Sequence, residues 1–244
     1  MNNYFINQIT INHDLIEQDS YLNDITIINS LDTLIFDSPI TFFVGENGTG
    51  KSTLLEAIAI KYGFNPEGGT LNFNFHTNNT HSSLYKSIII DRGYRRPREG
   101  FFLRAESFYN VATQLEEYEN SAPDPFRNYG GKSLHHQSHG ESFLTLIQYR
   151  FNQNSLYILD EPEASLSPQR QLTLLIKIHE LSKQGTQFII ASHSPILLGI
   201  PNAKILNFDD NKITPINYEE TESYQITELF INNRDGLLSK MLKK

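Results

Sequence analysis

The sequence has no cysteine among its 244 residues, which excludes a disulfide framework and cysteine-based zinc or redox chemistry. It also lacks the apolar run of roughly 20 residues that a helix needs to cross a bilayer. Its most apolar stretch, residues 188–200, is interrupted by two serines, a histidine and a proline. The first residues show neither the basic start nor the apolar segment of a secretory signal. We therefore expect a cytoplasmic protein without membrane insertion.

An excess of positive charge is missing as well. The formal net charge of −8 at pH 7 argues against a chain-wide field that would attract nucleic acid. A hydrophobic content of 39% and a charged content of 20% are ordinary for a globular chain. The length suffices for one hydrophobic core, so we expect a single domain over residues 1–244.

Residues 45–52, Gly-Glu-Asn-Gly-Thr-Gly-Lys-Ser, fit the phosphate-loop pattern G-x-x-x-x-G-K-[ST]. The apolar run 40–44 predicts a strand before this loop, and residues 52–60 predict a helix after it. Backbone N–H groups of such a loop surround phosphates, while Lys51 reaches the β and γ phosphates and the Ser52 hydroxyl holds Mg²⁺. The alternative is a chance glycine-rich turn. The predicted triphosphate site consists of Gly45, Glu46, Asn47, Gly48, Thr49, Gly50, Lys51, Ser52 and Thr53.

A second motif, Asp160-Glu161-Pro162, follows the continuous apolar run 155–159, which predicts a buried parallel strand. At the end of such a strand Asp160 can hold Mg²⁺ through water, and Glu161 can polarise a water aimed at the γ phosphate. The alternative is a surface pair of acids at a strand end. Next to a phosphate loop, the two acids indicate hydrolysis rather than phosphoryl transfer to a metabolite.

Two further segments point to phosphate. Residues 187–192 predict a strand that ends at His193, which can contact the γ phosphate, although a histidine at such a position is on its own more often structural. The segment 137–141 precedes a helical pattern over 142–147. Ser138, Gly140 and the amino end of that helix are therefore expected to form a second anion-binding surface.

The order of these motifs resembles that of the ABC-type ATPases. The run D-E-P-E-A-S-L-S-P at 160–168 is similar to the SMC-like, RecF-like and OLD-type branch. The runs V-G-E-N-G-T-G-K-S-T-L-L-E and R-R-P-R-x-G-F-F-L-R-A-E-S-F resemble small stand-alone predicted ATPases of that branch, of the AAA kind. The signature Q-S-H-G-E at 137–141 departs from the transporter-like L-S-G-G-Q.

The resemblance implies a homodimer packed head to tail in the ATP-bound state, with ATP and Mg²⁺ between the phosphate loop of one subunit and the signature of the other. Ser138 and Gly140 would contact the γ phosphate of the partner's nucleotide, and residues 163–168 would contact the partner. The implied catalytic residues are Lys51, Glu161 as general base and His193 as switch histidine, and the implied metal ligands are Ser52 and Asp160. The family's coupling glutamine is missing in its usual form. Glu106 or Ser107 is a candidate replacement, but we favour the interpretation that Glu106 only starts a helix.

The predicted fold is α/β, a P-loop domain of ABC-ATPase type with a mostly parallel central sheet and a short helical insertion at about 106–137. Residues 1–44 predict an N-terminal β part of short strands separated by polar turns. Ser167 as cap and Pro168 predict another helix start. Towards the end of the chain we expect a hairpin around 209–211 and helices near 223–232 and 235–243.

Two clusters allow more than one interpretation. One cluster consists of five arginines, Arg92, Arg95, Arg96, Arg98 and Arg104. They could contact phosphate, either of nucleic acid or of the bound nucleotide. Alternatively they form a basic rim that pairs with acids at 116–119 or with the partner subunit. We favour the basic rim. Three histidines are interpreted as part of the signature loop rather than as a metal site, because no fourth ligand is evident; they are His135, His136 and His139.

The sequence thus predicts a magnesium-dependent ATPase whose two subunits clamp ATP and separate after hydrolysis. Such an ATP-gated switch fits genome maintenance or anti-phage defence, acting on nucleic acid or through an effector protein. The alternatives are the ATPase subunit of a membrane transporter and a non-hydrolysing, ATP-dependent scaffold.

Overall fold

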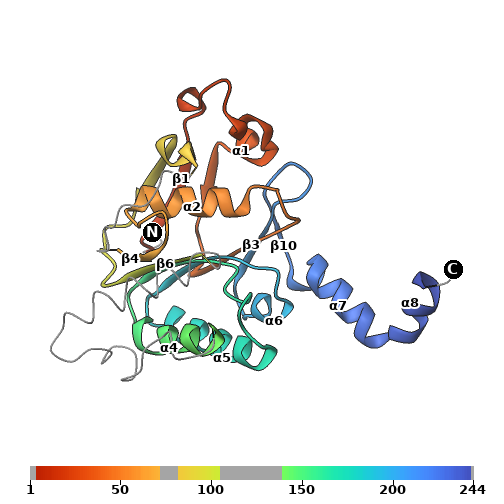
Figure 1. Ribbon diagram of the computed structural model, residues 1–244. Helices are drawn as coiled ribbons and strands as arrows, with labels where there is room; N and C mark the ends of the chain where they lie inside the picture. The colour runs from red at the N-terminus through yellow and green to blue at the C-terminus, as the bar shows by residue number, and fades with distance from the viewer. Residues whose placement is uncertain (1–3, 72–81, 105–138, 243–244) are drawn as a thin grey trace.

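The computed structural model describes residues 4–71, 82–104 and 139–242. A seven-stranded sheet forms its centre (Figure 1). The five inner strands are parallel and both edge strands are antiparallel to their neighbours, which confirms the predicted mostly parallel sheet. In order across the sheet the strands are β10 (Thr214–Ile216), β9 (Lys204–Asn207), β3 (Ile40–Val44), β8 (Gln187–Ala191), β7 (Leu156–Asp160), β6 (Gly100–Arg104) and β4 (Gly69–Thr70).

Helices cover both faces of this sheet, as Figure 1 shows. On one face lies α2 (Lys51–Tyr62), whose Leu54 and Ile58 join one apolar cluster with the strands. On the other face lie α4 (His139–Arg150), α5 (Pro168–Ser182) and α6 (Pro195–Leu198). Both β3 and β8 are buried at every position, as expected for parallel strands between two layers. The start of α5 at Pro168 is confirmed, although Ser167 makes no side-chain capping hydrogen bond.

A second sheet of three antiparallel strands, β2 (Thr33–Ile35), β1 (Ile6–Ile11) and β5 (Ile88–Arg92), forms the N-terminal β part. The prediction that turns alone separate the strands of residues 1–44 was wrong. Helical segments lie between β1 and β2, partly because the Ser20 hydroxyl accepts a hydrogen bond from the Leu22 N–H and starts one of them. These segments are η1 (His13–Leu15), η2 (Tyr21–Asp24) and α1 (Thr26–Ser30), while η3 (Ser83–Lys86) precedes β5.

The predicted hairpin around 209–211 is confirmed, since β9 and β10 pair on either side of it. Asp210 and Asn211 adopt positive φ angles of 57° and 62° there, which these residue types tolerate. The two predicted C-terminal helices are confirmed as α7 (Glu222–Asn232) and α8 (Arg234–Met241), which follow η6 (Tyr218–Glu220). Figure 1 shows both extending away from the body. The predicted insertion at 106–137 lies outside the described residues.

Candidate functional site

The loop between β3 and α2 is shaped by three glycines with positive φ angles, Gly45 at 134°, Gly48 at 85° and Gly50 at 98°. A Cβ at Gly50 would lie 2.7 Å from Ile25 Cγ2, and one at Gly45 would lie 2.9 Å from Asp209 Oδ1. No atom comes within 4 Å of a Cβ at Gly48. The loop is therefore tightly packed at both ends and open in the middle, where a ligand has room.

Lys51 starts α2 and turns its side chain back over this loop. Its Nζ donates hydrogen bonds of 2.6 Å to the carbonyl oxygens of Gly45 and of Glu46. Burial lowers the pKa of Lys51, while the nearby carboxylates of Asp209 and Glu161 oppose this change. The lysine amino group thus stands inside the loop, between carbonyl oxygens and acids.

Two residues that the sequence places 108 positions apart meet at the end of β7, where the Ser52 hydroxyl lies 3.0 Å from Asp160 Oδ1. Both α2 and β7 present these residues at the carboxyl edge of the parallel strands, where open α/β sheets bind ligands. The structure thereby brings the two predicted metal ligands together beside the loop.

Glu161 and His193, the predicted base and switch residue, face each other with 3.9 Å between Glu161 Oε1 and His193 Nε2. Their side chains are 45% and 42% exposed, so both are open to a ligand. Glu161 has a φ of 48°, a left-handed conformation that costs a glutamate about 1–3 kcal/mol. Its N–H donates to the Ala191 carbonyl at 2.9 Å, and this bond to β8 helps to hold the strained backbone in place.

Glu163 belongs to the same site, although the sequence indicated only that its loop contacts a partner. Its Oε1 accepts hydrogen bonds from Ser192 Oγ at 2.9 Å and from the His193 N–H at 2.6 Å. Its Oε2 is buried and has no hydrogen-bond partner among the described residues. Burial raises the pKa of Glu163, and the hydrogen bonds counteract this. Glu163 therefore ties the loop 163–168 to the backbone of His193.

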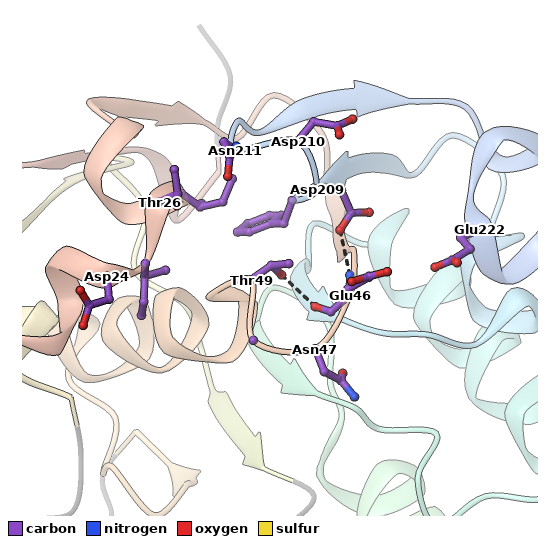
Figure 2. A pocket seen from close by; sticks show the side chains of 13 residues that line it. Asp24, Thr26, Glu46, Asn47, Thr49, Asp209, Asp210, Asn211 and Glu222 are labelled. Atoms are coloured by element: carbon purple, nitrogen blue, oxygen red, sulfur yellow. Dashed lines mark hydrogen bonds between the residues drawn. The ribbon is translucent and has the colours of Figure 1, made fainter.

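Asp209 is a second residue that the sequence did not assign to the site. Its Oδ1 accepts a 2.9 Å hydrogen bond from the Glu46 N–H, and the Thr49 hydroxyl donates to the Glu46 carbonyl at 3.0 Å (Figure 2). These bonds flank a pocket of about 630 Å³ beside the loop. The sequence signalled only the hairpin turn at this position. The acidic residues that line the pocket are Asp24, Glu46, Asp209, Asp210 and Glu222.

The predicted second anion surface is only partly described. Ser138 lies outside the described residues, so its role stays a prediction. Gly140 is buried in the first turn of α4, and a Cβ there would come within 2.6 Å of both the Ser165 carbonyl oxygen and Arg170 Nη1. Two segments that we expect to face a partner, 138–140 and 163–168, therefore touch at Gly140 and Ser165.

The arginine cluster makes contacts within the chain. Arg104 forms a 2.8 Å ion pair with Glu56 of α2. Arg92 donates to the Tyr62 carbonyl at 3.0 Å and lies 4.5 Å from the centre of the Tyr62 ring. These contacts agree with a structural role. The predicted pairing with the acids at 116–119 stays a prediction, because those acids lie outside the described residues.

The residues present fit a triphosphate with Mg²⁺. The open middle of the glycine loop and the ammonium of Lys51 suit an anion. The Ser52 hydroxyl and the Asp160 carboxylate are oxygen ligands of the kind that Mg²⁺ takes alongside phosphate oxygens. In the described part of the chain no helix combines the length and apolar character required to traverse a bilayer.

Comparison with known proteins places this chain in a family. Residues 69–199, more than half of the chain, match the family model described as "AAA domain, putative AbiEii toxin, Type IV TA system". An "Uncharacterized ABC transporter ATP-binding protein" of Haemophilus influenzae is 26% identical over 199 residues, which cover 70% of each chain.

A "Putative ABC transporter ATP-binding protein" of Bacillus cereus is 25% identical over 242 residues. This match covers 92% of the chain but spans only 42% of that relative. Among solved structures, the SMC head domain of Thermotoga maritima is similar with a TM-score of 0.44 and 16% identity, over 87% of this chain and 99% of the other.

Proposed function

Since the chain belongs to this AAA-domain family and is an ABC-type ATP-binding P-loop domain, we propose that it hydrolyses ATP with the help of Mg²⁺. The observation that carries the proposal is the meeting of the phosphate loop with the end of β7, where Ser52 lies 3.0 Å from Asp160 and Glu161 follows directly. Neither a chance glycine-rich turn nor a surface pair of acids explains why the two motifs meet at one point of the structure.

Each residue has a chemical task in this proposal. Lys51 and the loop N–H groups bind the β and γ phosphates, and Ser52 and Asp160 hold Mg²⁺, which neutralises phosphate charge when bound. Glu161 accepts a proton from the water that attacks the γ phosphorus, while the bond to the β–γ bridging oxygen breaks and ADP leaves. His193 faces the same point and contacts the γ phosphate.

The pocket beside the loop suits the nucleoside of ATP. Its lining carboxylates, among them Asp24 and Asp210, are hydrogen-bond acceptors. They suit groups that donate, namely ribose hydroxyls and the exocyclic amino group of adenine. Phe208 adds an aromatic side chain to the same lining.

We propose further that the active form is a head-to-tail homodimer in which Ser138 and Gly140 of one subunit complete the nucleotide site of the other. The contact between Gly140 and Ser165 supports this, because it gathers the two partner-facing segments at one surface. Glu163 then joins that surface to His193. Association and hydrolysis are coupled through the hydrogen bond from the His193 N–H to Glu163.

Such a dimer acts as an ATP-gated switch, in genome maintenance or in anti-phage defence, on an effector protein or on nucleic acid. The toxin–antitoxin wording of the family description is compatible with defence. The names of two relatives favour a second candidate, the ATPase subunit of a membrane transporter. Co-purification with a membrane protein would select the second candidate, and ATP-dependent binding of DNA would select the first.

Steady-state phosphate release with Mg²⁺ and ATP tests the chemistry. Glu161→Gln should retain ATP binding and lose turnover by about 10²- to 10⁴-fold, because the general base is removed. The matched control is Glu180→Gln, an exposed acid on α5, which should leave the rate unchanged. An unchanged rate in Glu161→Gln would remove Glu161 from its role, and no phosphate release by the unaltered protein would favour a non-hydrolysing scaffold.

A further inference from the structure

The helices α7 and α8, here called the C-terminal arm, contain no buried residue. Several large apolar side chains of the arm face solvent, with Leu229 at 50%, Ile231 at 71% and Met241 at 71% exposure. Helices of 11 and 8 residues are marginal in water unless an apolar face packs against another surface. The exposed apolar face of the arm therefore resembles one side of a protein interface, whose other side belongs to another molecule.

The arm begins at the mouth of the nucleotide site. A cavity of about 410 Å³ is bounded on one side by Gly45 and His193 and on the other by Glu222 and Ile226 of α7. In the proposed dimer, a second copy approaches this mouth to complete the site. The apolar surface of the arm is thus continuous with the surface on which the second copy would sit.

Charge also matches the last segment of the chain, residues 233–244, to another copy of this chain. Residues 233–244 hold four basic side chains and one acidic side chain, Asp235, whereas the whole chain has 28 acidic and 20 basic residues. A basic tip is therefore attached to a strongly acidic body. Such a tip is attracted to the body of a twin.

A groove between α7 and the body can receive an apolar helix. This groove of about 400 Å³ is lined on one side by Tyr224, Glu228 and Ile231 of α7, and on the other side by Leu172, Ile196 and Tyr218. Leu172 is 51% exposed. In Figure 1 the α8 of the same chain lies at the far end of the arm, away from α5 and α6.

We propose that the arm of each subunit packs on the second subunit, with the apolar side chains of α8 in this groove of the twin. This inference rests on the proposed function, because the ATP-bound dimer brings the twin within reach. The arm then adds a contact that the nucleotide sandwich alone lacks, and a helix in a groove is a common mode of such recognition. The occupant is a second copy of this chain.

Dimer affinity tests the proposal in the Glu161→Gln protein with ATP and Mg²⁺. Met241→Asp in the arm and Leu172→Asp in the groove should each weaken the dimer about 10-fold or more, the effect of one buried apolar anchor. The control is Ile89→Asp on β5, which is 56% exposed and should leave the affinity unchanged. Unchanged affinity in both variants would overturn the arm contact while leaving the ATP-dependent dimer intact.

A spectroscopic readout separates this inference from the proposed function. The chain has no tryptophan, so Met241→Trp adds a single reporter to α8. Its emission should shift to the blue when ATP assembles the dimer, and a dimer without this shift would overturn the arm contact. A Glu161→Gln protein that binds ATP and stays monomeric would instead overturn the proposed dimer. Loss of DNA affinity in Met241→Asp with an unchanged dimer would show that nucleic acid, not a twin, covers the arm.

Discussion

The body around the phosphate loop and the C-terminal arm differ in what holds their side chains in place. In the body, β3 and β8 are buried along their whole length, and hydrogen bonds join the loop to β7 and to the β9–β10 hairpin. In the arm, apolar side chains such as Ile231 are exposed and no residue is buried. The first region is packed on all sides within the chain, whereas the arm touches the rest of the chain only along part of α7, for example where the centre of the Tyr224 ring lies 4.8 Å from that of the Tyr218 ring.

This difference assigns nucleotide chemistry to the body and association to the arm. Geometry in the body is set by contacts of one subunit, so substitutions there change nucleotide chemistry and folding. The arm contributes little to the free energy of folding of one chain, so substitutions of its exposed apolar side chains away from the nucleotide site should change association alone. The following predictions test this separation.

The largest effect is expected for Lys51→Ala. Removing the ammonium that lies inside the loop should lower turnover by more than about 10²-fold, as loss of a preorganised positive group does, and should abolish tight ATP binding. Lys61→Ala, at the opposite end of α2, is the matched control. Calorimetric titration with ATP is the measurement, and wild-type affinity in Lys51→Ala would contradict the assignment of the loop.

Substitution of one isoleucine in each region compares directly how much the two regions contribute to the free energy of unfolding. Ile158 of β7 is fully buried and Ile231 of the arm is 71% exposed. Ile158→Ala should lower the free energy of unfolding by about 2–5 kcal/mol, whereas Ile231→Ala should change it by no more than about 0.5 kcal/mol. Equilibrium urea denaturation of the nucleotide-free protein measures both. Equal losses would show that the arm is part of the folded core.

Glu163→Ala should slow turnover about 10-fold, because the His193 N–H loses a buried acceptor worth about 1–3 kcal/mol. The KM for ATP should change little, since Glu163 is not among the loop residues that hold the phosphates. Glu163→Gln keeps an acceptor oxygen and should recover most of the rate. Identical rates for the two variants would mean that the bond to His193 does not position the histidine.

The smallest effect concerns pH. Burial raises the folded-state pKa of Glu163, so the folded protein keeps this proton at pH values where the unfolded chain has released it. The free energy of unfolding should therefore fall as the pH rises from the ordinary glutamate pKa to the raised one. Glu163→Gln, which cannot titrate, should lack this part of the decrease. Parallel stability curves for the two proteins would contradict the raised pKa.

Much of the fold could be predicted from the chain, because its signals are local. Continuous apolar runs indicated β3, β7 and β8, and the glycine loop indicated the start of α2. Strand ends that carry Asp160 and His193 were expected at one edge, since parallel strands share their carboxyl ends. The helical segments between β1 and β2 were missed because elements of three to five residues are too short to show a hydrophobic period.

The supporting contacts of the site could not be predicted, because they join residues far apart in sequence without a pattern of their own. The bond from Glu46 to Asp209 spans 163 positions. The hydrogen bond from the His193 N–H to Glu163 depends on the path of the loop that follows β7. The sequence indicated a helix near 223–232 but not that its apolar side chains would stay exposed, since burial is a property of the whole arrangement.

The central claim is that ATP joins two copies of this chain across the nucleotide site. Its most direct test is the mass in solution of the Glu161→Gln protein, measured by light scattering with and without ATP and Mg²⁺. We predict that the mass doubles from the 28.0 kDa of one chain when ATP is bound. A protein that binds ATP and remains at the mass of a single chain would contradict the claim.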